Sequence, residues 1–104
     1  MPGKYQRISP QKAQLIMQSN HVCIILDVRS KQEYNTRRIP GAFCLPNDKI
    51  FSLAPHQLPD KNAIILVYCK GGGRSKKAAT NLVAMGYTNV YDFGGINNWP
   101  YEVE

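Results

Sequence analysis

Two uninterrupted apolar runs dominate the hydrophobic pattern of the chain. They are VCIILDV (22–28) and AIILVY (63–68), and neither alternates with polar residues as a half-exposed strand would. Strands that are covered on both faces carry such runs, and parallel sheets contain strands of this kind. The two runs therefore predict central, parallel strands.

Helical and shorter extended patterns surround these runs. They predict an extended start and a helix in 7–20, a polar turn or helix in 30–38, a strand around 42–45, a helix in 75–86 and a short strand in 89–93. Ser9 is expected to cap the first helix, with Pro10 as its first residue. Gly86 is expected to end the helix in 75–86. This alternation predicts an open, mostly parallel α/β sheet with helices on both faces.

Ligands of such sheets bind beyond the carboxyl ends of the strands. Here those ends are Asp27 to Arg29, Leu45-Pro46 and Tyr68-Cys69. Cys69 therefore lies where this architecture places its sites.

Length and composition predict one soluble domain that spans residues 1–104. No stretch approaches the ~20 apolar residues of a membrane span. The start, MPGKYQRISPQK, lacks the apolar segment of a signal peptide, so a cytoplasmic protein is expected. The three cysteines have no paired spacing, which disfavours both a disulfide framework and a metal site.

The net charge of +6 admits nucleic acid, an anionic substrate, an acidic partner or merely solvated surface charge. No aromatic and basic face accompanies the charge, so nucleic acid is disfavoured. The nucleotide-binding patterns GxxxxGK[ST] and GxGxxG are absent, so a nucleotide cofactor is disfavoured as well.

The segment CKGGGRS (69–75) joins the second apolar run to a predicted helix. Its glycines allow backbone N–H groups to converge on one point, and the amino end of the helix, expected near Ser75, adds partial positive charge there. Four cations and no acid follow Cys69: Lys70, Arg74, Lys76 and Lys77. The segment predicts an anion-binding loop around the Cys69 sulfur.

These surroundings favour the thiolate form of Cys69, which is a nucleophile and can accept sulfur to become a persulfide. The same loop would attract an anionic sulfur donor such as thiosulfate. The alternative is a buried structural cysteine before a glycine-rich turn, and it explains neither the three glycines nor the arginine. Cys23 and Cys44 lie inside apolar runs, and we interpret both as structural.

Four motifs, in order, resemble those of one known family. They are ILDVRSKQEY (25–34), RIPGAFCLP (38–46), VYCKGGGRS (67–75) and VYDFGGINNW (90–99). Together they resemble the single-domain rhodaneses, which are thiosulfate sulfurtransferase-like proteins. The third motif is similar to the family's active-site pattern Cys-x-x-Gly-x-Arg-Ser, with Gly72 at its glycine. Arg37 and Arg38 replace the usual Gly-His, and they form either a solvated face or a patch for an acidic partner.

The resemblance implies a five-stranded parallel sheet and a two-step transfer without metal or organic cofactor. Cys69 would take sulfur from an anionic donor and pass it to cyanide or a cellular thiol. The donor would bind the backbone of the following six residues: Lys70, Gly71, Gly72, Gly73, Arg74 and Ser75. Four residues separate Cys69 from Arg74. The related phosphatases and arsenate reductases have five, so the shorter loop favours sulfur chemistry.

Two other functions use the same loop. One is a persulfide carrier or partner-binding module, placed in a sulfur relay and turning over small donors poorly. The other is a catalytically idle regulatory domain, which is disfavoured because Cys69 and Arg74 are both present.

Several residues near these motifs allow a structural interpretation. Asp27 either shapes the loop or pairs with Arg29, whose other possible partner is Glu33. Arg74 is expected to bind donor oxygens or brace loop carbonyls.

The remaining side chains have simpler expectations. Ser75 is predicted to be a helix N-cap, Lys70 to face solvent and Trp99 to lie in the core. His21 and His56 are given no catalytic role.

Overall fold

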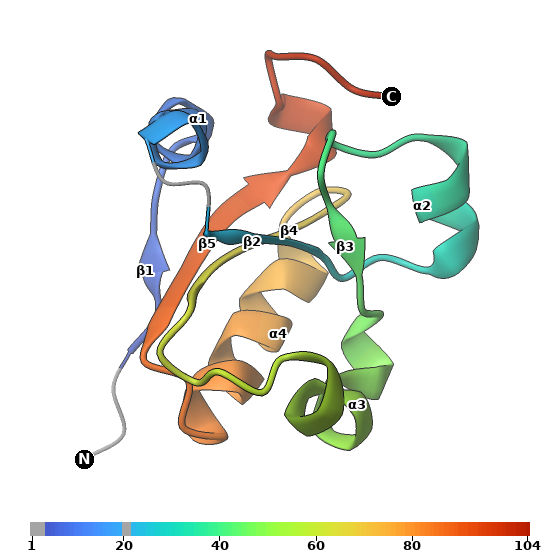
Figure 1. The fold of residues 1–104 in the computed structure, drawn as a ribbon. Helices are drawn as coiled ribbons and strands as arrows, with labels where there is room; N and C mark the ends of the chain where they lie inside the picture. Colours follow the sequence, from blue (N-terminus) through green and yellow to red (C-terminus); the bar gives the residue numbers. More distant parts are fainter. Residues whose placement is uncertain (1–3, 20–21) are drawn as a thin grey trace.

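A computed structural model describes residues 4–19 and 22–104 of the chain (Figure 1). Within these residues, five parallel strands form one sheet in the order β1-β5-β4-β2-β3. The strands are β1 (Gln6–Arg7), β2 (Ile24–Asp27), β3 (Phe43–Cys44), β4 (Ile64–Cys69) and β5 (Asn89–Gly95). The predicted α/β class and parallel sheet are confirmed.

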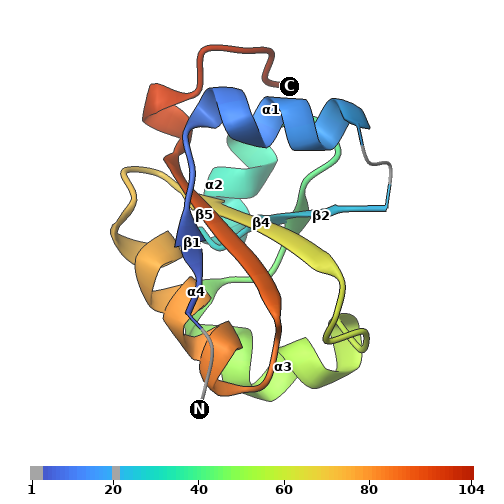
Figure 2. The same ribbon diagram turned by 90° about the vertical axis from the view of Figure 1, so that its left-hand side faces the viewer.

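Helices cover both faces of the sheet, as the sequence predicts. They are α1 (Pro10–Ser19), α2 (Lys31–Thr36), α3 (Ile50–Gln57) and α4 (Gly73–Ala84), with short 3-10 helices η1 (Asn47–Lys49) and η2 (Ile96–Asn98). In Figures 1 and 2, α1 and the segment after β5 lie above the sheet, whereas α3 and α4 lie below it.

Strand β4 supplies buried side chains to both faces of the sheet. Ile65 and Val67 pack in a cluster with residues of α3 and α4. Leu66 and Tyr68 pack in a second cluster, which includes Ala13 of α1 and Trp99. Because both faces are covered, residues 63–68 need no polar alternation, and the run reads as continuously apolar.

The predicted ends of two helices are confirmed. The Ser9 hydroxyl accepts a hydrogen bond from the Lys12 N–H at 3.0 Å, so Ser9 caps α1. Gly86 follows α4 with a positive φ of 99°, the backbone conformation that ends many helices. Trp99 is buried and packs 5.4 Å from the Phe93 ring, as a core residue does.

Helix α3 has no counterpart among the predicted segments. It contains Pro55, which has no N–H to donate and which the sequence pattern treats as a helix breaker. Ile50 and Ala54 are nonetheless fully buried against α4 and the sheet. Tertiary packing therefore maintains a helix that local propensity disfavours. Among the described residues, no helix is long and apolar enough to cross a membrane.

Candidate active site

Cys69 is the last residue of β4, and the segment after it folds over its sulfur. We call residues 70–75 the Cys69 loop. The Gly72 N–H donates a hydrogen bond to Cys69 Sγ at 3.0 Å. Cys69 is only 1% exposed, so its sulfur is almost fully covered. The architecture thus places one thiol inside a turn of backbone at the carboxyl end of a central strand.

The three loop glycines differ in what their positions require. Gly72 has a φ of +109°, a conformation that other residues rarely adopt. A Cβ on Gly71 or Gly73 would meet no atom within 4 Å. Only Gly72 among the three therefore needs to be glycine to shape the loop.

The position of Ser75 corrects the sequence prediction. Helix α4 begins at Gly73, with Gly72 as its N-cap, and Ser75 is buried in the first turn. Its hydroxyl donates to the carbonyl oxygens of Gly72 at 3.1 Å and Gly94 at 3.3 Å, so it ties the helix to β5 instead of capping it. The positive φ at Gly72 turns the chain into the helix earlier than predicted. The positive end of α4 therefore lies closer to Cys69 along the chain.

The end of β5 packs against the Cys69 loop. A Cβ placed on Gly95 would lie 2.1 Å from the Lys70 carbonyl oxygen, so only glycine fits there. The Asn97 N–H donates to the same oxygen at 3.2 Å. Sequence reasoning noted this Gly-Gly segment only as part of a resemblance and missed its contact with the loop.

Asp27 and Arg29 form a buried network at the end of β2. The Arg29 guanidinium donates to Asp27 at 2.7 Å, and the Tyr68 hydroxyl donates to the same carboxylate at 2.7 Å. Burial raises the pKa of Tyr68 far above its usual value, so its hydroxyl remains a donor. The interpretation of Asp27 and Arg29 as a structural pair is therefore confirmed. Among the described residues, the Asp27 side chain makes no hydrogen bond to the backbone of the Cys69 loop.

Arg74 does not brace the loop carbonyls, one of its two predicted roles. Both ends of its guanidinium donate to Glu33, at 2.7 and 2.9 Å. This hydrogen bonding lowers the pKa of Glu33 to about 2 and raises that of Arg74. Glu33 is 41 residues away in the chain, and no local pattern signals the pairing.

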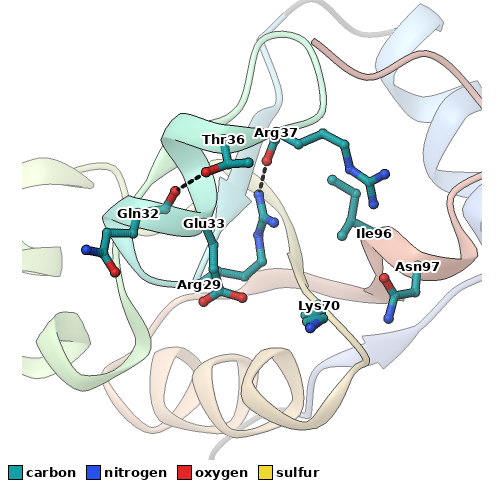
Figure 3. Close-up of a pocket in the computed structure, with 8 residues that line it drawn as sticks. All are labelled: Arg29, Gln32, Glu33, Thr36, Arg37, Lys70, Ile96 and Asn97. Atoms are coloured by element: carbon teal, nitrogen blue, oxygen red, sulfur yellow. Dashed lines mark hydrogen bonds between the residues drawn. The ribbon is translucent and has the colours of Figure 1, made fainter.

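Two clefts flank the Glu33–Arg74 pair. Figure 3 shows the first, of about 300 Å³, where Glu33 extends from α2 towards α4 and Lys70 lies on the loop. The second cleft, of about 380 Å³, is lined by Arg74 and three further cations, Arg29, Lys31 and Lys49. Cations outnumber acids in the lining of both clefts, which suits an anionic ligand.

The chain matches the sequence profile of the rhodanese-like domain over residues 9–101. It belongs to the rhodanese-like family. The predicted resemblance is therefore confirmed.

Two curated relatives extend this assignment. The adenylyltransferase and sulfurtransferase UBA4 of Meyerozyma guilliermondii is 36% identical over 107 residues, a match that covers 95% of this chain. The chain spans only 24% of the length of that relative. The thiosulfate sulfurtransferase GlpE of Haemophilus influenzae is 33% identical, with 91% of this chain and 88% of the relative covered.

A solved structure, described as a rhodanese with anions from Escherichia coli, has the same fold. Its TM-score is 0.72 at 31% identity, and the match covers 78% of this chain and 95% of the other.

The other cysteines of this rhodanese-like chain lie apart from the loop. Cys23 and Cys44 are half-buried and free, and burial raises the pKa of both thiols. Raised values disfavour the thiolate, which fits the prediction that neither is the nucleophile.

The remaining expectations concern surface residues. Lys70 is exposed, as predicted, whereas Arg38 pairs with Glu104 at 3.2 Å and lies over the Tyr34 ring. Arg37 instead lines the first cleft, so the two arginines lie in different environments. His56 is exposed on α3, and His21 lies outside the described residues.

Proposed function

We propose that the chain is a sulfurtransferase of the thiosulfate sulfurtransferase type, with Cys69 carrying the transferred sulfur as a persulfide. The observation behind the proposal is the Cys69 sulfur, buried at a strand end and bonded by the Gly72 N–H at the start of α4. A helix N-terminus and an N–H donor both stabilise negative charge on sulfur. The relatives named thiosulfate sulfurtransferase support the same activity.

In the first step, the Cys69 thiolate attacks the outer sulfur of thiosulfate. A new S–S bond forms, the S–S bond of the donor breaks, and sulfite leaves with the bonding electron pair. Thiosulfate arrives as a dianion and sulfite leaves as a dianion. The loop must therefore attract the donor and still release the product. Exposed cations such as Lys70 and those of the two clefts attract it electrostatically.

In the second step, a thiophilic acceptor attacks the outer sulfur of the Cys69 persulfide. Cyanide becomes thiocyanate, or a thiol becomes a persulfide, and Cys69 is released as a thiolate. The N–H groups of the Cys69 loop, residues Lys70 to Ser75, would stabilise each anionic sulfur in turn. The cycle requires neither a metal nor an organic cofactor, because the cysteine itself holds the transferred atom.

A persulfide carrier in a sulfur relay is the second candidate function. It is supported by the UBA4 relatives, whose name joins a sulfurtransferase to an adenylyltransferase in one longer protein. A carrier would load the same Cys69 from a protein donor and would turn over thiosulfate poorly.

Intact-mass spectrometry before and after addition of thiosulfate tests the proposal. We expect a gain of one sulfur mass, ~32 Da, that maps to Cys69 and disappears with cyanide. Cys69→Ser is expected to abolish the gain, whereas Cys23→Ser and Cys44→Ser retain it. A folded, reduced protein that gains no sulfur from thiosulfate but gains it from a persulfide would favour the carrier. Absence of loading from both donors would refute persulfide chemistry at Cys69.

A further inference from the structure

The Glu33–Arg74 pair stands at the boundary of the two clefts. Glu33 lines the first cleft and Arg74 lines the second. We propose that Glu33 is a specificity-determining residue, which occupies Arg74 and so discriminates against small oxyanion donors such as thiosulfate. The inference rests on the proposed function and names which donors that site prefers.

The donor groups of Arg74 are already engaged by Glu33. A planar guanidinium is the side chain best suited to bind two oxygens of one oxyanion, and a lysine offers only a point charge. Both terminal nitrogens of Arg74 are already bonded to Glu33, at 2.7 and 2.9 Å. A donor that binds the two terminal nitrogens together must therefore displace a carboxylate that holds them with matching geometry.

Glu33 is held in position independently of Arg74. Its carboxylate accepts hydrogen bonds from the Ser30 N–H at 3.1 Å and the Ser30 hydroxyl at 3.0 Å. The first of these bonds, together with the Glu33 N–H that donates to the Ser30 hydroxyl at 3.2 Å, forms the capping box of α2. The competing carboxylate is thus fixed before it meets the arginine, and little entropy opposes the pairing.

A persulfide donor makes no such demand on Arg74, because its leaving group is a thiolate and carries no sulfonate oxygens for a guanidinium to bind. The Cys69 thiolate attacks the outer sulfur of R–S–SH, the donor S–S bond breaks, and the thiolate R–S⁻ leaves. Cys69–S–SH is the product, and atoms and charge balance. Glu33 therefore penalises thiosulfate and leaves persulfide donors unaffected, so the preferred donor class is a persulfidated thiol.

Glu33→Gln separates the charge of Glu33 from its structural role. Glutamine is the other residue that completes a capping box, so α2 keeps its cap while Arg74 loses its ionic partner. With cyanide as acceptor, we expect the KM for thiosulfate to fall roughly three- to tenfold and kcat to stay unchanged. The KM for 2-mercaptoethanol persulfide should not change.

Three further variants make the test specific. Ser30→Ala removes one of the two bonds that fix the carboxylate but keeps its charge, so it should lower the KM for thiosulfate by a smaller factor than Glu33→Gln does. In an Arg74→Gln background, Glu33→Gln should have no further effect, because Glu33 acts through Arg74. If Glu33→Gln does not fold, Glu33→Asp, whose shorter side chain cannot make both bonds, should lower KM in the same direction by a smaller factor.

The outcomes separate this inference from the function beneath it. Two results would overturn the role of Glu33 alone while Cys69 still loads with sulfur. One is an unchanged or higher KM for thiosulfate in Glu33→Gln, and the other is the same decrease in that KM when Glu33→Gln is made in the Arg74→Gln background. The role of Glu33 would also be overturned if the persulfide loaded Cys69 but thiosulfate loaded it in neither the wild type nor Glu33→Gln. No loading of any variant from either donor would instead refute the proposed function.

Discussion

Arg29 and Arg74 each pair with a carboxylate at the carboxyl edge of the sheet, and their closest N–O distances are both 2.7 Å. Their surroundings differ. The side chains of the Arg29–Asp27 pair are 5% and 0% exposed, whereas those of the Arg74–Glu33 pair are 40% and 30% exposed. The two ion pairs have the same closest distance, so only their burial indicates that they contribute differently to stability.

The partners of each pair reinforce the contrast. Asp27 also accepts hydrogen bonds from the Arg29 N–H and the Tyr68 hydroxyl, and the Arg29 guanidinium also donates to the Arg37 carbonyl. These bonds join β2, β4 and the end of α2 in one network that is largely buried. Among the described residues, Arg74 has Glu33 as its side-chain hydrogen-bond partner, and both side chains are partly exposed. The buried arginine is therefore scaffold, and the half-exposed arginine is available for exchange with a ligand.

The same substitution at both arginines tests this contrast most directly. Arg29→Gln leaves a buried carboxylate without its cation and should lower the free energy of unfolding by about 3–5 kcal/mol. Arg74→Gln breaks a solvated pair and should cost less than about 1 kcal/mol. Urea denaturation of both variants beside wild type measures the two losses. Similar losses at the two positions would show that burial does not distinguish the pairs.

The fold was predictable from the sequence where burial is two-sided. The runs 22–28 and 63–68 have no polar alternation, and they became neighbouring strands β2 and β4. Helix α3 was not predictable, because Pro55 argues against a helix and its support comes from packing of Ile50 and Ala54. A local sequence pattern reports the preferences of neighbouring residues, whereas this helix depends on contacts with residues that are distant in the chain.

The site shows the same division. The Cys69 loop follows from residue types and spacing that lie within one segment, so the sequence predicts its composition. Ser75 was placed wrongly because its hydroxyl bonds to Gly94, 19 residues away, and no sequence pattern reports that contact. Likewise Arg74 and Glu33 meet only after α2 and α4 are both folded against the sheet.

Tyr68→Phe tests the hydroxyl that completes the buried network. The Tyr68 oxygen donates to Asp27 and accepts from the Ile39 N–H at 3.1 Å, so phenylalanine leaves a buried N–H unsatisfied. The ring itself should keep its packing 5.5 Å from Phe93. We expect the free energy of unfolding to fall by about 1–3 kcal/mol, less than for Arg29→Gln. A loss below the one measured for Arg74→Gln would place this hydroxyl outside the scaffold.

The smallest expected effect is the pH dependence of the exposed pair. Arg74 lowers the pKa of Glu33 from its usual 4.5 to about 2, so the ionised carboxylate is favoured in the folded chain. The stability from this pair is therefore complete above pH 4.5 and is lost as pH falls towards about 2. Urea denaturation of wild type and Arg74→Gln should give a difference of less than about 1 kcal/mol at about pH 6, which shrinks steadily below pH 4.5. If that difference stayed constant down to about pH 3, a contact other than the Glu33 charge would account for it, and Arg74 would belong with the scaffold after all.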